Sequence, residues 1–298
     1  MEKLKFKKFI DDFDLDEYIK VSYNSILNDT EFYEVLIRSG FTNSDIKNNL
    51  SKFIEYRKSF QLAKKIHSYD DCVKLNSFEN LILIKDGDDV EKRYEPFKPV
   101  SDMIQYRSLF VIKDFESEFD TISWKDCDNK SAKSEINNRF KKDKWCYLYG
   151  SSRTGKSYLS IAFLNGFNRK KNNTVGFMNA ISGFKKLQDL YFSNFKKDKE
   201  EYTYFFDSLC DCELLVIDDF GNEYKNEIVR DCIVFPLIQN RSKNSKMTIF
   251  TSNYSIYEIS KMYSLGKEIG EIKANQMKNL LLQMCEKEIN FGNTPNLY

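Results

Sequence analysis

From residue 145 onward, short apolar runs alternate with longer segments in which apolar residues recur every three or four positions. The short runs are typical of strands buried in a parallel sheet, and the longer segments are typical of helices that cover such a sheet. This part of the chain therefore favours an α/β fold with a parallel sheet. The predicted strands are 145–149, 174–178, 213–218 and 247–252, and the predicted helices are 156–168, 181–195, 225–241 and 270–286.

The first 100 residues show a different pattern. Apolar residues at helical spacing predict helices within 9–19, 32–36 and 46–54. The run Leu81-Ile82-Leu83-Ile84 predicts a strand that ends at the turn signal Lys85-Asp86-Gly87-Asp88. The pattern over the first 100 residues therefore indicates helices with at most a small sheet.

Pro96 and Pro99 indicate a linker after this region. We therefore expect a smaller, mainly helical N-terminal domain over 1–100, a linker and lead-in over 101–144, and the α/β domain over 145–298. The charged tract at the end of the lead-in predicts a solvated helix. A chain of 298 residues is long enough for two modest domains.

One loop between a predicted strand and a predicted helix carries recognisable chemistry. Gly150-Ser151-Ser152-Arg153-Thr154-Gly155-Lys156-Ser157 has the pattern G-x4-G-K-[ST] of a phosphate-binding loop, in the strand–loop–helix context that this motif requires. Its glycines let backbone N–H groups face phosphates, and the helix N-terminus adds positive charge. All eight residues are candidate ATP-binding residues. We expect Lys156 to reach the terminal phosphates, Ser157 to hold Mg²⁺ and Arg153 to point to solvent.

Two further strand ends carry polar residues that suit the same chemistry. Leu214-Leu215-Val216-Ile217-Asp218-Asp219 is an apolar run that ends in two acids, the form of a Walker B element. Asp218 is expected to hold Mg²⁺ and Asp219 to polarise the attacking water. Asn253 follows the next strand, where it either orients that water or forms an ordinary strand-exit turn.

Composition narrows the class of protein. Lys and Arg number 46 and Asp and Glu number 45, so the net charge is +1 and no global basic field indicates nucleic acid. Seven scattered Cys without a C-x-x-C pair and a single His favour a reduced cytosol over disulfides or a metal site. No apolar run approaches about 18 residues, and the start does not read as a signal peptide, so we expect a cytoplasmic protein without a membrane span.

A local basic and aromatic segment is nevertheless present at 184–197. Lysines interleaved with aromatic rings suit single-stranded DNA, because cations follow phosphates while rings stack on bases. The candidate contacts are Lys185 and Lys186. The same segment also fits the buried stripe of an ordinary helix, and the pattern alone does not decide between the two interpretations.

Four blocks occur in order at matching spacing: Gly150–Ser157, Leu214–Glu223, Val229–Asp231 with Phe235–Arg241, and Phe250–Asn253. Together they resemble the bacterial replicative helicase loaders of the DnaI/DnaC kind, within the AAA+ ATPases, and the DnaI type most closely. The resemblance extends over roughly residues 110–292. It implies an AAA+ P-loop ATPase domain that associates with itself, and an N-terminal domain that binds the hexameric replicative helicase.

The resemblance also implies roles for single residues. Asn253 would be the sensor-1 residue. Arg241 would be an arginine finger that reaches the nucleotide of a neighbouring subunit, although a cation at a helix C-terminus is also favoured by the helix dipole alone. Arg230 and Asp231 would form an intersubunit contact or a simple surface pair.

The chain departs from these loaders in two places. The second-sensor arginine is missing, and Lys278 is the nearest cation, which implies that ATP turnover is weak or depends on a partner. Of the ligands of the loaders' N-terminal zinc module only Cys72 is present, whereas a closed zinc site needs four ligands. We therefore predict no zinc, and a small apolar core around Leu81–Ile84 in its place.

The sequence thus predicts an ATP-dependent loader of the replicative DNA helicase onto single-stranded DNA, acting in initiation or restart of DNA replication in the primosome. Two alternatives stay open: an AAA+ helper ATPase of a transposase, and a non-hydrolysing ATP-dependent scaffold. The cofactors would be ATP and Mg²⁺.

Overall fold

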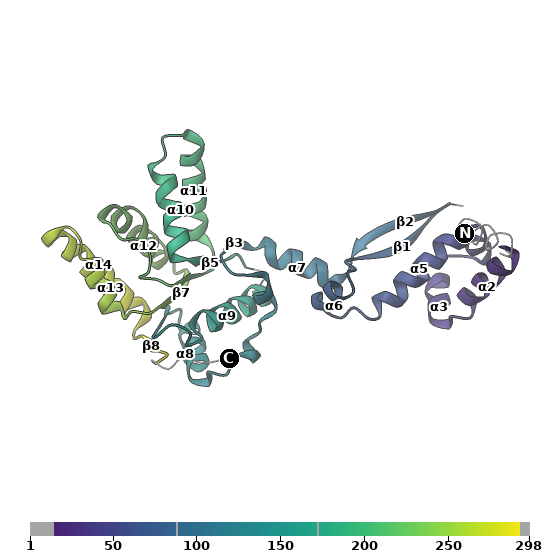
Figure 1. Cartoon of the computed structure of the whole chain (residues 1–298), viewed down its shortest axis with the longest axis horizontal. Helices are drawn as coiled ribbons and strands as arrows, with labels where there is room; N and C mark the ends of the chain where they lie inside the picture. Colours follow the sequence, from purple (N-terminus) through teal and green to yellow (C-terminus); the bar gives the residue numbers. More distant parts are fainter. Residues whose placement is uncertain (1–14, 88, 172, 293–298) are drawn as a thin grey trace, which may run out of the picture. The chain divides into compact units, whose positions relative to one another are not determined.

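The computed structural model describes residues 15–87, 89–171 and 173–292. The chain divides into two compact units, one up to Gln105 and one from Tyr106, and each is described by itself (Figure 1). Among the described residues, no helix has the length and apolar character needed to cross a membrane.

The first unit is mainly helical, as predicted, and contains one hairpin. The run 81–84 lies in β1, which pairs antiparallel with β2, so the predicted strand is confirmed. Thr42 and Asp45 cap each other's backbone at the start of α4, and Ser68 and Asp71 do the same at α6. The elements are α2 (Leu15–Leu27), α3 (Thr30–Arg38), α4 (Asn43–Asn48), α5 (Leu50–Ala63), α6 (Tyr69–Lys74), β1 (Glu79–Asp86), β2 (Asp89–Pro96) and α7 (Lys98–Ser108), which runs across the division.

Two apolar clusters hold the first unit together. The larger one packs Leu81 and Leu83 of β1 against buried aromatic residues of the helices, among them Phe32 and Phe53. This is the small apolar core that the sequence predicts. The second cluster encloses the thiol-bearing Cys72, which is fully buried among Ile66, Phe97 and Val100.

The second unit contains a six-stranded parallel sheet in the order β3-β5-β6-β7-β4-β8. All four predicted strands are confirmed. Two strands were not predicted: β3 comes from the segment expected as lead-in, and β8 is only two residues long. The strands are β3 (Phe110–Lys113), β4 (Cys146–Tyr149), β5 (Val175–Asn179), β6 (Leu214–Asp218), β7 (Met247–Ser252) and β8 (Ile289–Asn290).

Helices cover both faces of this sheet. The crossover from β4 to β5 runs in one direction along the sheet and the later crossovers run in the other. Because such connections are right-handed, α9 lies on one face and α10, α11 and α12 lie on the other, as Figure 1 shows. The helices are α8 (Lys130–Phe140), α9 (Lys156–Lys171), α10 (Ala180–Phe192), α11 (Lys196–Asp211), α12 (Phe235–Lys243), α13 (Ile256–Met262) and α14 (Lys267–Cys285), with the short 3-10 helices η1 (Ser117–Thr121) and η2 (Trp124–Asp126).

The predicted helices at 225–241 and 181–195 differ from the structure. The first begins as a π-helix, η3 (Val229–Val234), before α12. Pro236 has no N–H to donate, and the hydroxyl of Tyr202 donates instead to the carbonyl of Cys232, four residues earlier, at 3.4 Å. The second ends at Phe192 and is followed by α11, a helix that the apolar pattern did not predict.

The topology determines where the functional residues meet. Strands β6, β7 and β4 are neighbours and parallel, so their carboxyl ends lie at one edge of the sheet. The loop after β4, the acids at the end of β6 and the asparagine after β7 are therefore adjacent.

Candidate nucleotide-binding site

The predicted phosphate loop lies between β4 and α9 in a conformation that needs its glycines. Gly150 has φ 141°, and a Cβ there would lie 2.7 Å from the carbonyl oxygen of Gly292. Gly155 has φ 87°. Arg153 is also left-handed, at φ 62°, and its side chain is exposed, as predicted. The loop curls back just before α9, which begins at Lys156.

Lys156 lies at the centre of this loop. Its Nζ donates to the carbonyl oxygens of Gly150 at 2.8 Å and Ser151 at 2.7 Å, and to Oδ1 of Asn253 at 3.4 Å. Burial lowers the pKa of the Lys156 ammonium, while Asp219 and Asp218 act in the opposite direction. Asp218 at the end of β6, Asp219 directly after it and Asn253 after β7 are thus close to this amine.

Ser157 and Asp218 meet directly. The Ser157 hydroxyl donates to Oδ1 of Asp218 at 2.7 Å, and the Thr251 hydroxyl donates to the same oxygen at 2.5 Å. Burial raises the pKa of the Asp218 carboxyl, and the two hydroxyl groups oppose this shift. A hydroxyl beside a buried carboxylate is a donor set that Mg²⁺ prefers.

Asp219 and Asn253 complete the site. Asp219 has φ 56°, a left-handed conformation that costs a residue with a side chain about 1 kcal/mol. Its N–H donates to Oγ1 of Thr251 at 3.0 Å, which holds this backbone in place. Asn253 Oδ1 also accepts from the Ser152 hydroxyl at 3.4 Å. Thr251 was not among the predicted site residues, because a Thr inside an apolar strand gives no signal of its own.

A small pocket opens beside the loop. It has a volume of about 60 Å³ and is lined by Thr154 and Gly155 of the loop, Tyr158 and Leu159 of α9, Phe291 and the segment 126–129. Since it adjoins both the loop and the first turn of α9, it can receive a group attached to a bound phosphate.

These residues fit a nucleoside triphosphate with Mg²⁺. Lys156 supplies a cation that at present serves only carbonyl, hydroxyl and amide oxygens of its own chain, so it can turn to a phosphate. Ser157 and Asp218 are 2.7 Å apart and can share one cation. Four of the five predicted catalytic residues lie at this edge of the sheet: Lys156, Asp218, Asp219 and Asn253. The fifth, Arg241, does not.

Arg241 lies elsewhere, and the structure contradicts the arginine-finger role that the resemblance implied. Its side chain is 1% exposed. The guanidinium donates to main-chain oxygens of Leu209 at 2.5 Å, Cys212 at 3.0 Å and Met247 at 2.5 Å, and to Oγ1 of Thr248 at 2.9 Å. A group enclosed by its own chain in this way cannot reach a neighbouring subunit, so Arg241 holds α11, α12 and β7 together.

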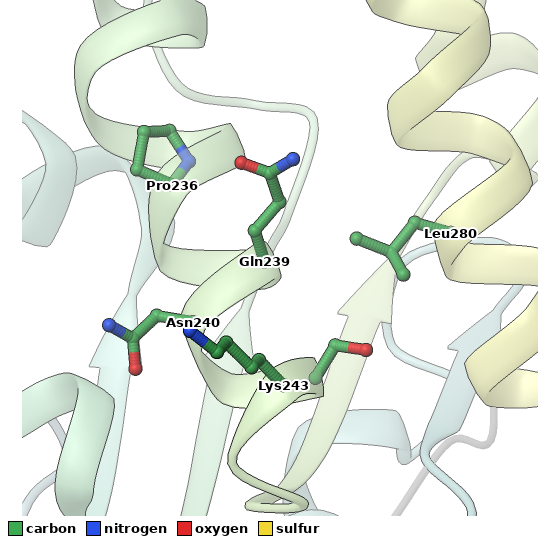
Figure 2. Close-up of a pocket in the computed structure, with 6 residues that line it drawn as sticks. Pro236, Gln239, Asn240, Lys243 and Leu280 are labelled. Carbon is green, nitrogen blue, oxygen red and sulfur yellow. The ribbon is translucent and has the colours of Figure 1, made fainter.

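The outer face of α12 carries other side chains. Figure 2 shows Gln239, Asn240 and Lys243 of this helix together with Leu280 of α14 around a pocket of about 560 Å³. The exposed Lys243 is the cation that this helix presents outward, next to the buried Arg241.

Arg230 is likewise an internal residue. It is 1% exposed, forms two bonds to Asp231 and donates to the main-chain oxygens of Tyr263 and Leu265. Asp231 also binds Lys273 of α14 at 2.5 Å. The expected intersubunit contact is therefore a link between η3 and the C-terminal helices of the same chain. Lys278 donates to Asn275 at 2.8 Å.

Lys185 and Lys186 lie on the exposed side of α10. Lys185 pairs with Asp189 at 2.8 Å and Lys186 with Glu201 of α11 at 3.2 Å. Phe184 and Leu187 of the same helix are buried, so the apolar stripe is part of the core. Exposed ion pairs are weak, about 0–1 kcal/mol, and leave the lysines able to exchange partners. The DNA-binding role of these two residues stays a prediction.

Among the described residues, no group of three or more His, Cys, Asp or Glu lies close enough to hold a metal ion. The absence of zinc stays a prediction as well.

No model of a protein family matches the chain, and no curated protein matches it. Solved structures do match. A proposed primosome component from Streptococcus pyogenes serotype M3 is 19% identical, with a TM-score of 0.49, over 65% of this chain and 98% of the other. DnaI is 22% identical, with a TM-score of 0.50, over 63% of this chain and 98% of the other. The DnaC helicase loader is 21% identical, with a TM-score of 0.45, over 60% and 100%.

At these identities the comparison with DnaI establishes the fold. The resemblance that the order of the motifs indicated is confirmed at this level, and so is the predicted fold class. The chain contains an α/β unit that shares the fold of DnaI, preceded by a smaller, mainly helical unit.

Proposed function

We propose that this chain is an ATP-dependent loader that places the replicative DNA helicase on single-stranded DNA during initiation or restart of replication. The observation that carries the proposal is the meeting of Ser157 with Asp218, and of Lys156 with Asn253, at the carboxyl edge of an AAA+ sheet. The order of the four motif blocks and the likeness to the fold of DnaI support the choice of a loader.

In this proposal each residue of the site has its own role in ATP binding or hydrolysis. Lys156 neutralises charge on the terminal phosphates, Ser157 and Asp218 hold Mg²⁺, and Asp219 polarises the attacking water. Asn253 positions that water or the terminal phosphate. The bound cation would supply further charge neutralisation at the phosphates.

Titration of the full chain with a fluorescent ATP analogue and Mg²⁺ tests the nucleotide site. Lys156→Ala should weaken binding by about tenfold or more, since it removes a charged partner of the phosphates. Lys170→Ala, on an exposed turn of the same helix, is the matched control and should bind like wild type. Equal affinity of wild type and Lys156→Ala would rule out the phosphate site.

The first unit would bind the helicase. Its helices α2 and α3 expose large apolar side chains, with Val21 61% and Ile37 50% exposed. Exposed apolar residues gathered on neighbouring helices suit a protein partner. Self-association would use the outer face of α12, where Lys243 is exposed, instead of Arg241.

Co-sedimentation of the full chain with the purified hexameric helicase tests the partner. Wild type should co-sediment, and Val21→Asp with Ile37→Asp should abolish it, because two charges would have to be buried at the contact. Val73→Asp, on α6 and 53% exposed, provides the control. Failure of the wild-type chain to co-sediment would contradict the loader proposal without affecting the nucleotide site.

A further inference from the structure

An aromatic groove lies on the second unit, away from the phosphate loop. It has a volume of about 620 Å³ and runs between α8, the C-terminal half of α9 and η2. We call it the α8–α9 groove. Its aromatic wall is continuous: Trp124 packs on Phe163 at 5.3 Å between ring centroids, and Phe140 packs on Phe163 and Phe167 at 5.4 Å each. These four rings are only half buried, so their apolar faces stay accessible to a ligand in the groove.

The rim of the groove is cationic. Lys125, Arg169 and Lys170 line it, and no acid is among its described lining residues. Arg169 is fixed, since it donates to the carbonyl of Asp120 at 2.6 Å and lies over the ring of Tyr106 at 4.7 Å. Lys125 and Lys170 are exposed, and neither is in an ion pair within the described part of the chain. The rim therefore attracts an acidic partner.

The floor of the groove contains a helix-interior glycine that the fold itself does not require. Gly166 lies within α9, and a Cβ built there would meet nothing within 4 Å. Glycine inside a helix costs about 0.5–1 kcal/mol relative to alanine. The missing side chain keeps the floor of the groove open, between Phe163 and Phe167.

We propose that the α8–α9 groove is a docking site for an acidic amphipathic segment of a partner protein. Such a segment would insert one or two large apolar side chains between Trp124, Phe140 and Phe167, over Gly166, while its Asp and Glu residues face Lys125 and Lys170. Apolar anchors at helical spacing in a groove between helices are a recurring mode of peptide recognition. The charges at the rim would set specificity and the rate of association more than the affinity.

Fluorescence anisotropy with the full chain tests the proposal. The probe is a fluorescein-labelled synthetic peptide of about 16 residues, rich in Glu, with Leu and Phe at positions i, i+3, i+4 and i+7. It should bind with a Kd on the order of 10–100 µM, and more weakly at high salt. A peptide with Lys in place of Glu, and one with Ser in place of Leu and Phe, should each bind at least about tenfold more weakly.

Matched variants locate the contact. Gly166→Leu fills the floor and should weaken binding by about tenfold or more, whereas Gly166→Ala should stay within about twofold. Lys125→Glu with Lys170→Glu should also weaken it by about tenfold, and the same charge change at Lys196 and Lys197 of α11 should not. Each variant is first checked for a melting temperature no lower than that of wild type and for unchanged binding of Mg²⁺-ATP. Half-buried Trp124 gives a second readout, because its fluorescence should change on binding.

Several results would overturn the proposal. The first is a lack of saturable binding of the Glu-rich peptide up to about 1 mM. The second is equal affinity of Gly166→Leu and Gly166→Ala for this peptide. The third is equal affinity of the wild-type chain for the Glu-rich and the Lys-rich peptides. Saturable binding of laurate without binding of the acidic peptide would assign the groove to a small apolar anion. Self-association of wild type that Gly166→Leu abolishes would assign it to a second copy of this chain.

Discussion

Replacing Arg241 by Ala should unfold the second unit at a markedly lower temperature. The guanidinium bonds main-chain oxygens near the end of α11, a main-chain oxygen at the start of β7 and the Thr248 hydroxyl, and its side chain is 1% exposed. Truncation to Ala leaves at least four buried oxygens with one bond fewer. It also leaves a cavity where three elements meet.

The size of the effect follows from these contacts. Each buried acceptor that loses its partner costs about 1–3 kcal/mol, and less where a main-chain oxygen keeps a second bond. Removal of one partner from a buried charged network costs about 3–5 kcal/mol in total. For a unit of this size each kcal/mol lowers the melting temperature by about 2–4 °C, so a fall of about 6–20 °C is expected.

Thermal unfolding of the full chain, followed by tryptophan fluorescence, measures this effect. Trp145 is a local reporter, because it is buried and its Nε1–H donates to the carbonyl of Lys246, next to Met247. Lys243→Ala removes an exposed cation from the same helix and should change stability by less than about 0.5 kcal/mol. If Arg241→Ala melted like wild type and lost only ATP hydrolysis in the assembled state, the buried role would be refuted and the arginine finger reinstated.

Three further predictions test other parts of the structure. Thr251→Val should weaken Mg²⁺-dependent ATP binding by about tenfold in a fluorescence titration, since it removes bonds to Asp218 and Asp219 worth about 1–3 kcal/mol; exposed Thr203→Val is the control, and equal affinity would exclude this role. The hydrogen bond from Lys85, helped by the N–H and hydroxyl of Thr42, lowers the pKa of Asp45 from 3.8 to about 2, so its stabilising effect is present above the ordinary pKa and is lost as pH falls toward 2. Asp45→Asn should therefore flatten the loss of stability of the first unit between pH of about 5 and 2, Glu34→Gln should not, and an unchanged acid unfolding profile would contradict the shift. Lys185→Glu with Lys186→Glu should weaken single-stranded DNA binding and reduce its salt dependence; unaltered binding and salt dependence would end the role of these residues in DNA contact.

The meeting of the candidate nucleotide-binding residues could be predicted from the sequence because its signals are local. A glycine-rich loop after one strand and polar residues at the ends of two others define it, and a parallel sheet must bring those ends together. Thr251 escaped detection, because its hydroxyl acts from within an apolar strand and only the register of β7 beside β6 shows it.

The predicted arginine-finger role of Arg241 was wrong because the burial of this residue has no local signal in the sequence. A charged residue near a helix C-terminus is expected at the surface, and no pattern indicates that several main-chain oxygens converge on it. The same holds for Arg230, whose acceptors lie 33 and 35 residues away in the sequence. Long-range burial of this kind is set by tertiary packing, which periodicity within one helix does not contain.

The secondary structure shows a similar difference, because most elements with a clear local pattern were predicted and elements without one were not. Four strands with continuous apolar runs were predicted. Of the two edge strands that were missed, β8 is only two residues long, too short to give a pattern, and the apolar run of β3 lies in the segment expected as lead-in. The charged start of α11 concealed a helix whose buried residues, among them Phe205 and Leu209, lie in its second half.

The central claim is tested most directly by helicase loading. The measurement is unwinding of a forked DNA by the purified replicative helicase on single strands coated with single-strand binding protein. The full wild-type chain with Mg²⁺-ATP should stimulate unwinding at least about tenfold, and Lys156→Ala should not, while it still binds the helicase. Stimulation by Lys156→Ala equal to that by wild type, or none by a wild-type chain that binds both ATP and the helicase, would contradict the proposed function.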